Sequence, residues 1–315
     1  MSIDPKAKAL LDRMRQMGMK PLSNMSVKEA RQMVLDTMGE TPPAKPVVSI
    51  SNRMIPGPAG DIPIRIYKPR GIGSFPLLIF FHGGGFVLCD LNTHDHMCRN
   101  LCAGANCLVM SVEYRLAPEN KFPAATDDAL AATRWAAEYA SHIGGDPGRI
   151  AVAGDSAGGN LSAVTALRIR DQGGPSLCGQ LLIYPATDYY KPGTTSLREY
   201  SGYFFTMEDL IWFTGHYLND ESEADHPYAF PMRAADLTNL PPALVITAEC
   251  DPLRDEGENY AARLKSAGVA VMLIRYDGMI HGFFNYIGVL DQAQEAMDYA
   301  CSWLKDVFSG IYLKR

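Results

Sequence analysis

The feature that most constrains the fold is a Gly-Asp-Ser-Ala-Gly-Gly segment at residues 154–159. It follows the apolar run 150–153 and leads into 160–167, whose pattern is typical of a helix. A serine between small residues in a strand–turn–helix context predicts a sharp turn with a strained backbone at Ser156. The small neighbours leave room for that turn, so the serine hydroxyl is expected to project from the top of a sheet.

Apolar runs and helical patterns alternate along most of the chain, which predicts an α/β fold with helices on both faces of a mostly parallel, eight-stranded sheet. Two alternating segments, 47–51 and 62–67, are predicted to form an antiparallel edge. The denser apolar runs predicted as strands are 77–81, 108–112, 150–153, 180–184, 243–248 and 271–276. The predicted helices between and after them are 94–103, 124–140, 160–170, 256–267 and 291–308.

Two further helical regions do not belong to this alternation. Asp4 is expected to cap a first helix, and Ser26 with Glu29 forms a capping box before a second one. Between residues 184 and 243 there is no convincing strand, but 206–218 predicts a helix with an aromatic face. We expect this insertion to fold over the carboxyl ends of the strands and to pack against the N-terminal helices. The predicted boundaries are 1–46 for N-terminal cap helices, 47–187 and 236–315 for the α/β core, and 188–235 for the cap insertion.

Composition excludes some classes of function. The chain has 315 residues and a formal net charge of −6, which argues against a nucleic-acid partner. Its longest apolar run, about 75–81, is far shorter than the roughly 20 residues of a membrane span. The N-terminal segment has no apolar stretch of the signal-peptide type. We therefore expect no membrane span and a cytoplasmic location.

A serine nucleophile needs a general base, and His281 is the best placed of the seven histidines. It follows the predicted strand 271–276, where α/β sheets place their sites. His94 and His96 flank Asp95 in a pattern that also suits metal ligands. Because no other ligand-type residues cluster there, we interpret this segment as the solvated start of a helix.

The base needs an acidic group to orient it, and Asp251 is the preferred candidate. It stands three residues after the predicted strand 243–248, and Pro252 favours an extended backbone before it. Asp255 and Glu249 are the alternatives. We expect Asp255 to cap the following helix instead, and Glu249 to be a loop salt-bridge partner.

Backbone donors for a developing oxyanion are expected in the His-Gly-Gly-Gly-Phe segment at 82–86, directly after the predicted strand 77–81. Consecutive glycines let amide groups turn toward a ligand without obstruction. The amide of Ala157 is expected to join them. We expect His82 to fix the loop rather than act as a second base.

Taken together, the chain resembles the hormone-sensitive lipase family of α/β-hydrolase carboxylesterases, in its microbial branch. The motifs that carry the resemblance are the HGGG at 82–85, YRLAPE at 114–119, GDSAGG at 154–159, DPLRD at 251–255 and HGF at 281–283. The resemblance implies a helical cap and assigns Asp251 rather than Asp255 as the triad acid. It also implies that Gly84 and Gly85 donate to the oxyanion together with Ala157.

The expected activity is therefore a serine carboxylic-ester hydrolase that needs no metal or cofactor. Phe86, Phe205 and Phe213, with Phe204 and Trp212, are candidates for the wall of an apolar acyl pocket, with packing inside the cap as the alternative for each. By analogy, we expect short- to medium-chain esters of small molecules as substrates, and a homodimer. An amidase on the same triad is one alternative. A ligand receptor on the same scaffold is another, but gibberellin receptors of this type have lost the histidine.

Overall fold

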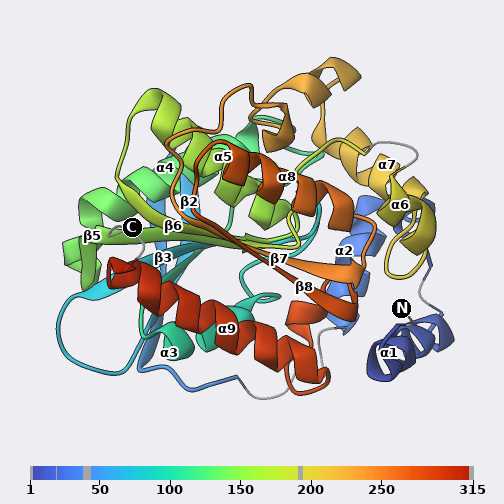
Figure 1. Ribbon diagram of the computed structural model, residues 1–315, viewed down its shortest axis with the longest axis horizontal. Coiled ribbons are helices and arrows are strands. Elements are labelled where there is room, and N and C mark those ends of the chain that lie inside the picture. Colours follow the sequence, from blue (N-terminus) through green and yellow to red (C-terminus); the bar gives the residue numbers. More distant parts are fainter. Residues whose placement is uncertain (1–2, 19, 38–43, 191–193, 312–315) are drawn as a thin grey trace.

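A computed structural model describes residues 3–18, 20–37, 44–190 and 194–311 of the chain. The predicted fold class is confirmed, because an eight-stranded sheet is its centre (Figure 1). The sheet has the order β1-β2-β4-β3-β5-β6-β7-β8. The strands are β1 Ser49–Gly57, β2 Gly60–Lys68, β3 Phe75–Phe81, β4 Leu108–Val112, β5 Gly145–Asp155, β6 Leu177–Ile183, β7 Ala243–Cys250 and β8 Val271–Ile280.

Only the first two strands break the parallel arrangement. β1 pairs with β2 and β2 with β4 in antiparallel fashion, and all other neighbours are parallel. The antiparallel edge was predicted, but β1 begins two residues later than predicted and extends to Gly57. The reason is a tight Gly57–Gly60 reversal, which lets the register continue to the end of both strands.

Helices cover both faces of the sheet because successive side chains of a strand point to opposite sides. Leu78 and Phe80 pack with α3 Asp95–Ala105 and α9 Asp291–Phe308 on one face. Leu77, Ile79 and Phe81 pack on the other face. That second face is covered by α4 Ala124–Tyr139, α5 Ala157–Gln172 and α8 Arg254–Ser266 (Figure 1).

The chain changes direction at the pair β3 and β5. From β3 it passes to α3 on one face and then to β4, whereas from β5 it passes to α5 on the opposite face and then to β6. Ligands of open α/β sheets bind in the crevice outside the carboxyl ends of strands at such a switch point. The glycine-rich turn after β3 and the serine turn after β5 both lie there.

We use the term outer helices for α1 Pro5–Gln16, α2 Val27–Thr37, α6 Thr195–Tyr200 and α7 Met207–Tyr217. They gather at one end of the molecule, at the right of Figure 1. The predicted caps are present, since Asp4 accepts two backbone N–H groups at the start of α1 and Ser26 pairs reciprocally with Glu29. The remaining short helices are η1 Leu22–Asn24, η3 Ala140–Ile143, η4 Glu221–Asp225, η5 Pro231–Arg233 and η6 Phe283–Asn285.

The predicted contact between the N-terminal helices and the insertion exists. Asp209 of α7 accepts the N–H of Ser23 at 2.8 Å, and the indole N–H of Trp212 donates to the carbonyl of Met25 at 3.2 Å. Two segments far apart in the sequence therefore form one layer. Across the described ranges, no helix combines the length and the apolar character that crossing a membrane would require.

Candidate active site

Ser156 occupies the strained turn that the sequence predicted. It lies between β5 and α5 with φ 54° and ψ −116°, a conformation that L residues rarely adopt. The flanking residues must be small, because a Cβ atom on Gly158 would lie 1.9 Å from the carbonyl oxygen of Phe81. The turn is therefore pressed against the end of β3, and the Ser156 side chain is directed away from it.

Three predicted side chains meet at the carboxyl ends of three parallel strands. The Nε2 atom of His281 lies 3.0 Å from Oγ of Ser156, and its Nδ1 atom lies 2.7 Å from Oδ2 of Asp251. Ser156 follows β5, Asp251 follows β7 and His281 follows β8. Parallel strands place these ends at one edge of the sheet, so residues distant in sequence come together.

The imidazole of His281 is held on several sides. Its ring lies between the rings of Tyr184 and Phe205, with centroid distances of 4.7 and 4.8 Å. The second carboxylate oxygen of Asp251 accepts the N–H of Leu253 at 2.8 Å, which fixes the carboxylate. Asp251 is fully buried and His281 is almost so. The geometry suits proton transfer between the serine and a correctly oriented imidazole.

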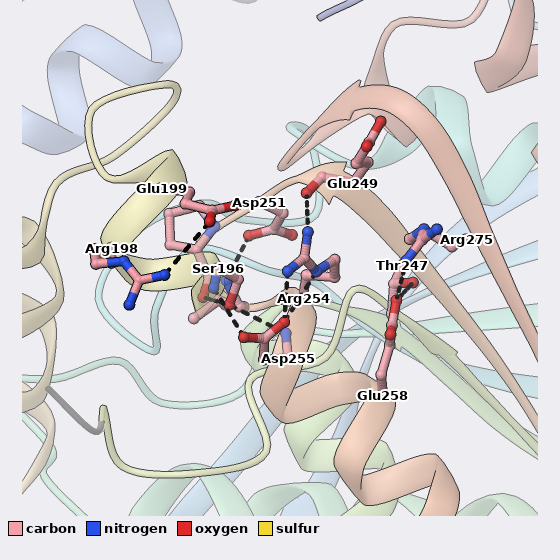
Figure 2. Close-up of polar contacts among 12 residues, drawn as sticks. Ser196, Arg198, Glu199, Thr247, Glu249, Asp251, Arg254, Asp255, Glu258 and Arg275 are labelled. Atoms are coloured by element: carbon pink, nitrogen blue, oxygen red, sulfur yellow. Dashed lines mark hydrogen bonds and ion pairs between the residues drawn. The ribbon is translucent and has the colours of Figure 1, made fainter. Parts of the chain in front are cut away.

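The two alternative acids are occupied elsewhere. Asp255 does not cap α8 as we expected, because it lies within the first turn of that helix, where its own N–H needs a partner. Its carboxylate instead accepts the N–H of Ser196 and pairs with Arg254 (Figure 2). Glu249 accepts the N–H of Gly278 at 2.7 Å, from within strand β7 rather than from a loop.

The glycine-rich turn after β3 has the unusual backbone that its sequence predicted. Gly84 has φ 108° and Gly85 has φ 61°, both in the region that favours glycine. A Cβ on Gly85 would lie 2.2 Å from the ring of Phe213 in α7, so this turn also touches the outer helices. His82 fixes the turn as expected: its Nδ1–H donates to the carbonyl of Gly83. Burial lowers the pKa of His82 to about 4, so the ring is neutral at pH 7.

The interpretation of the His94-Asp95-His96 segment as a solvated helix start is wrong. Both histidines are more than nine-tenths buried. Nε2 of His94 lies 3.1 Å from Oδ1 of Asp155, the residue before Ser156. Burial alone would raise the pKa of Asp155, but His94, with His82 and the N–H of Gly83, more than offsets this, and the pKa lies below its usual value.

A cavity of about 470 Å³ opens above Ser156. Phe86, Phe205 and Phe213 line it, as the sequence suggested. Trp212 is not among the lining residues in the described part of the chain. It packs within the layer of outer helices and donates to Met25.

One cavity residue was missed in the sequence. Glu256 of α8 lines the cavity and accepts the N–H groups of Thr187 and Asp188 with a single carboxylate oxygen. Burial raises its pKa well above the ordinary value, and the nearby Asp188 and Asp251 act in the same direction. Its position one helical turn after Leu253 was the available signal.

Metal chemistry has no obvious protein ligands here. Among the residues that the structure describes, no three or more His, Cys, Asp or Glu side chains are grouped to hold a metal ion. His94 and His96 are both buried and border the same cavity, and Asp95 pairs with Arg99 and Arg65.

Comparison with known proteins agrees with this architecture. A family model described as the alpha/beta hydrolase fold matches residues 78–285. The carboxylesterase NlhH of Mycobacterium tuberculosis is 43% identical over 311 residues, which is 96% of this chain and 95% of NlhH. The carboxylic ester hydrolase LipN of the same organism is 49% identical over 245 residues, and the match spans 76% of this chain but only 65% of LipN. A hyperthermophilic esterase from the archaeon Pyrobaculum calidifontis superposes with a TM-score of 0.91 at 42% identity, covering 97% of this chain and 99% of that one.

The chain therefore belongs to the α/β-hydrolase family, within the branch that contains these esterases. It is an enzyme of the carboxylic-ester hydrolase class, and the expectations of family and class are confirmed.

Proposed function

We propose that this enzyme hydrolyses carboxylic esters through a covalent acyl-enzyme on Ser156, with His281 as general base and Asp251 as the orienting acid. The observation that carries the proposal is the continuous contact from Oγ of Ser156 through the imidazole to Asp251, with distances of 3.0 and 2.7 Å. A serine hydroxyl becomes a competent nucleophile only with such a base in reach.

The steps follow from these contacts. His281 takes the proton of Ser156 as the hydroxyl oxygen attacks the ester carbonyl, and Asp251 stabilises the imidazolium that forms. The imidazolium then gives its proton to the departing alcohol. Water repeats the sequence on the acyl-enzyme and releases the acid.

The negative charge on the carbonyl oxygen needs donors, and we assign this role to the amides of Gly84, Gly85 and Ala157. Ala157 is the first residue of α5, so its N–H has no helical acceptor. The positive φ angles of Gly84 and Gly85 support a turn whose amides face the serine. Removal of one such donor typically costs about 10²–10³ in turnover.

The substrates we propose are short- to medium-chain esters. The cavity of about 470 Å³ is at the small end for ligand sites, and the rings of Phe86, Phe205 and Phe213 give it apolar walls. We further propose that residues 1–46 and 188–235 act as a cap that closes this cavity from above. We also propose a cytoplasmic location and a homodimer.

A series of p-nitrophenyl esters from acetate to palmitate tests both parts of the proposal. We expect the highest kcat/KM between acetate and octanoate, and loss of nearly all activity in Ser156→Ala. A variant as active as the parent would contradict the nucleophile. An optimum at palmitate would contradict the short pocket while leaving the nucleophile intact.

Amide hydrolysis is the second candidate, because the same apparatus serves both bonds. Matched p-nitrophenyl esters and p-nitroanilides of one acid distinguish the two. We expect the ester to be turned over far faster, since it has the better leaving group and needs less assistance from His281.

A further inference from the structure

The buried pair of His94 and Asp155 lies directly behind the proposed catalytic turns, yet the mechanism above does not use it. Each residue is 3% exposed. Asp155 is the last residue of β5 and immediately precedes Ser156. His94 is the residue before α3, at the end of the loop that follows the glycine-rich turn. A buried carboxylate is costly unless it is paired and hydrogen-bonded, so a charge at this place needs an explanation.

His94 lies between a hydroxyl group and the Asp155 carboxylate. Its Nδ1 atom lies 2.8 Å from Oγ1 of Thr93, and that hydroxyl also contacts the carbonyl of Asp90 at 2.7 Å. On the other side of the ring, Nε2 lies 3.1 Å from Oδ1 of Asp155. The interaction with His94 lowers the pKa of Asp155, so the histidine stabilises the charged form of this buried carboxylate.

Asp155 in turn holds the glycine-rich turn. Its Oδ1 atom accepts the N–H of Gly83 at 2.9 Å, one residue before the proposed oxyanion donors. The fit is close, because a Cβ on Gly83 would lie 2.6 Å from the other carboxylate oxygen. The same carboxylate therefore ties the serine turn to the oxyanion turn.

This arrangement has an electrostatic risk. An unpaired carboxylate beside the turn would oppose the negative charge that develops on the ester oxygen. Pairing with His94 opposes that effect, so Asp155 can hold Gly83 with less cost to the transition state.

We propose that His94 is a positioning residue of this esterase: by pairing with Asp155, it lets the carboxylate clamp the Gly83–Gly85 turn in the geometry that stabilises the oxyanion. The proposal rests on the proposed function. Both residues border the cavity, but the contact that links them to the oxyanion donors passes through the backbone of the turn.

The proposal makes a specific prediction for a double-mutant cycle. His94→Gln leaves Asp155 charged and unpaired, so we expect kcat for p-nitrophenyl butyrate to fall about 10²-fold with little change in KM. Asp155→Asn keeps an acceptor for Gly83 without the charge, and its loss should be smaller. The double variant should recover at least about tenfold over His94→Gln, since residues in contact are not additive.

Each kcat is expressed per active site, titrated with a p-nitrophenyl phosphonate that reacts with the serine. A purely structural role would lower the titrated fraction or Tm but leave kcat per site unchanged, and that result would overturn the proposal. Additive losses in the cycle would overturn it as well. If His94→Gln does not fold, Thr93→Val removes the contact with Nδ1 of His94 together with the two hydrogen bonds to Asp90, and it should lower kcat in the same direction by a smaller factor.

His96→Gln is the matched control, from the same His-Asp-His segment. His96 is buried to a similar degree and borders the same cavity, but its described interaction with Asp155 is only electrostatic, whereas His94 lies 3.1 Å from that carboxylate. We expect kcat per site to fall clearly less in His96→Gln than in His94→Gln, and an equal loss in both variants would contradict the role of the pair. Ser156→Ala keeps the two proposals separate, because an active Ser156→Ala variant contradicts the proposed function whatever the cycle gives.

Discussion

Two turns at strand ends, residues 82–86 after β3 and 154–159 at the end of β5, form one wall of the cavity, and the outer helices form another. These two walls are built in different ways. In the turns, backbone presses on backbone: a Cβ on Gly158 would lie 1.9 Å from the carbonyl oxygen of Phe81. In the outer helices, α7 is linked to the N-terminal segment by individual hydrogen bonds, such as the one from the indole N–H of Trp212 to the carbonyl of Met25. Gly215 of α7 has no atom within 4 Å of the place where its Cβ would be.

The difference separates two tasks. The turns fix atoms whose positions must be correct to a fraction of an ångström, and close backbone packing leaves them one arrangement. The outer helices set the size and lining of the cavity through side chains that can change one at a time. We therefore expect variants in the turns to alter kcat or folding, and variants in the outer helices to alter KM and substrate range.

Asp251→Asn should produce the largest effect. The amide leaves the geometry nearly unchanged but no longer favours the Nδ1–H form of His281, so we expect kcat to fall by about 10⁴-fold. Asp255→Asn is the control, since Asp255 binds Ser196 and Arg254 instead of the imidazole. Steady-state kinetics on p-nitrophenyl butyrate measures both. Similar losses in the two variants would remove the distinction between these carboxylates.

A pair of glycine substitutions tests the packing difference itself. Gly158→Ala places a methyl group against the end of β3, so the free energy of unfolding should fall by about 3 kcal/mol or more. Gly215→Ala stands in an open position of α7 and should raise it by about 1 kcal/mol through helix propensity. Urea unfolding followed by circular dichroism gives both values. If the free energy of unfolding of Gly158→Ala equals that of the parent, the serine turn is not packed more tightly than the outer helices.

The same difference explains how far the sequence could be read. Ser156, Asp251 and His281 each come shortly after an apolar run, and the rule that parallel strands share their carboxyl edge was enough to bring them together. His94 was misread, because a His-Asp-His segment is locally polar. Its partner, Asp155, lies at the end of β5, about 60 residues further along the chain, and no local pattern predicts that contact.

The outer helices were less predictable for a geometric reason. Trp212 and Phe213 are neighbours on α7, and both belong to its predicted aromatic face. Which of two adjacent helical residues reaches the cavity depends on the rotation of the docked helix, and the sequence does not specify this rotation. The structure directs Phe213 to Gly85 and Trp212 to Met25.

These two neighbours give a test of moderate size. Phe213→Ala removes a wall of the cavity, so KM for p-nitrophenyl butyrate should rise about tenfold through lost apolar contact, with a smaller change in kcat. Trp212→Phe loses the bond to Met25 and should lower the free energy of unfolding by about 1 kcal/mol while KM is unchanged. A large fall in kcat for Phe213→Ala would show that the outer helices also hold the glycine-rich turn, and the two walls would no longer be independent.

The smallest effect concerns two buried carboxyl groups at the strand ends that differ in their partners. Asp155 has a histidine beside it, and its pKa is lowered, whereas Glu256 accepts only amides and its pKa is raised by burial. A carboxyl group whose pKa is raised by folding binds more protons in the folded than in the unfolded chain. The free energy of unfolding therefore falls as the pH rises above 4.5, the ordinary pKa of a glutamate.

Glu256→Gln keeps an acceptor for the N–H of Thr187 and removes that pH dependence. Its Tm should match the parent near pH 4 and exceed it at pH 8. If Glu256→Gln is less stable than the parent at pH 8, the hydrogen bonds of Glu256 offset the cost of burying its charge, as the partners of Asp155 do for that residue.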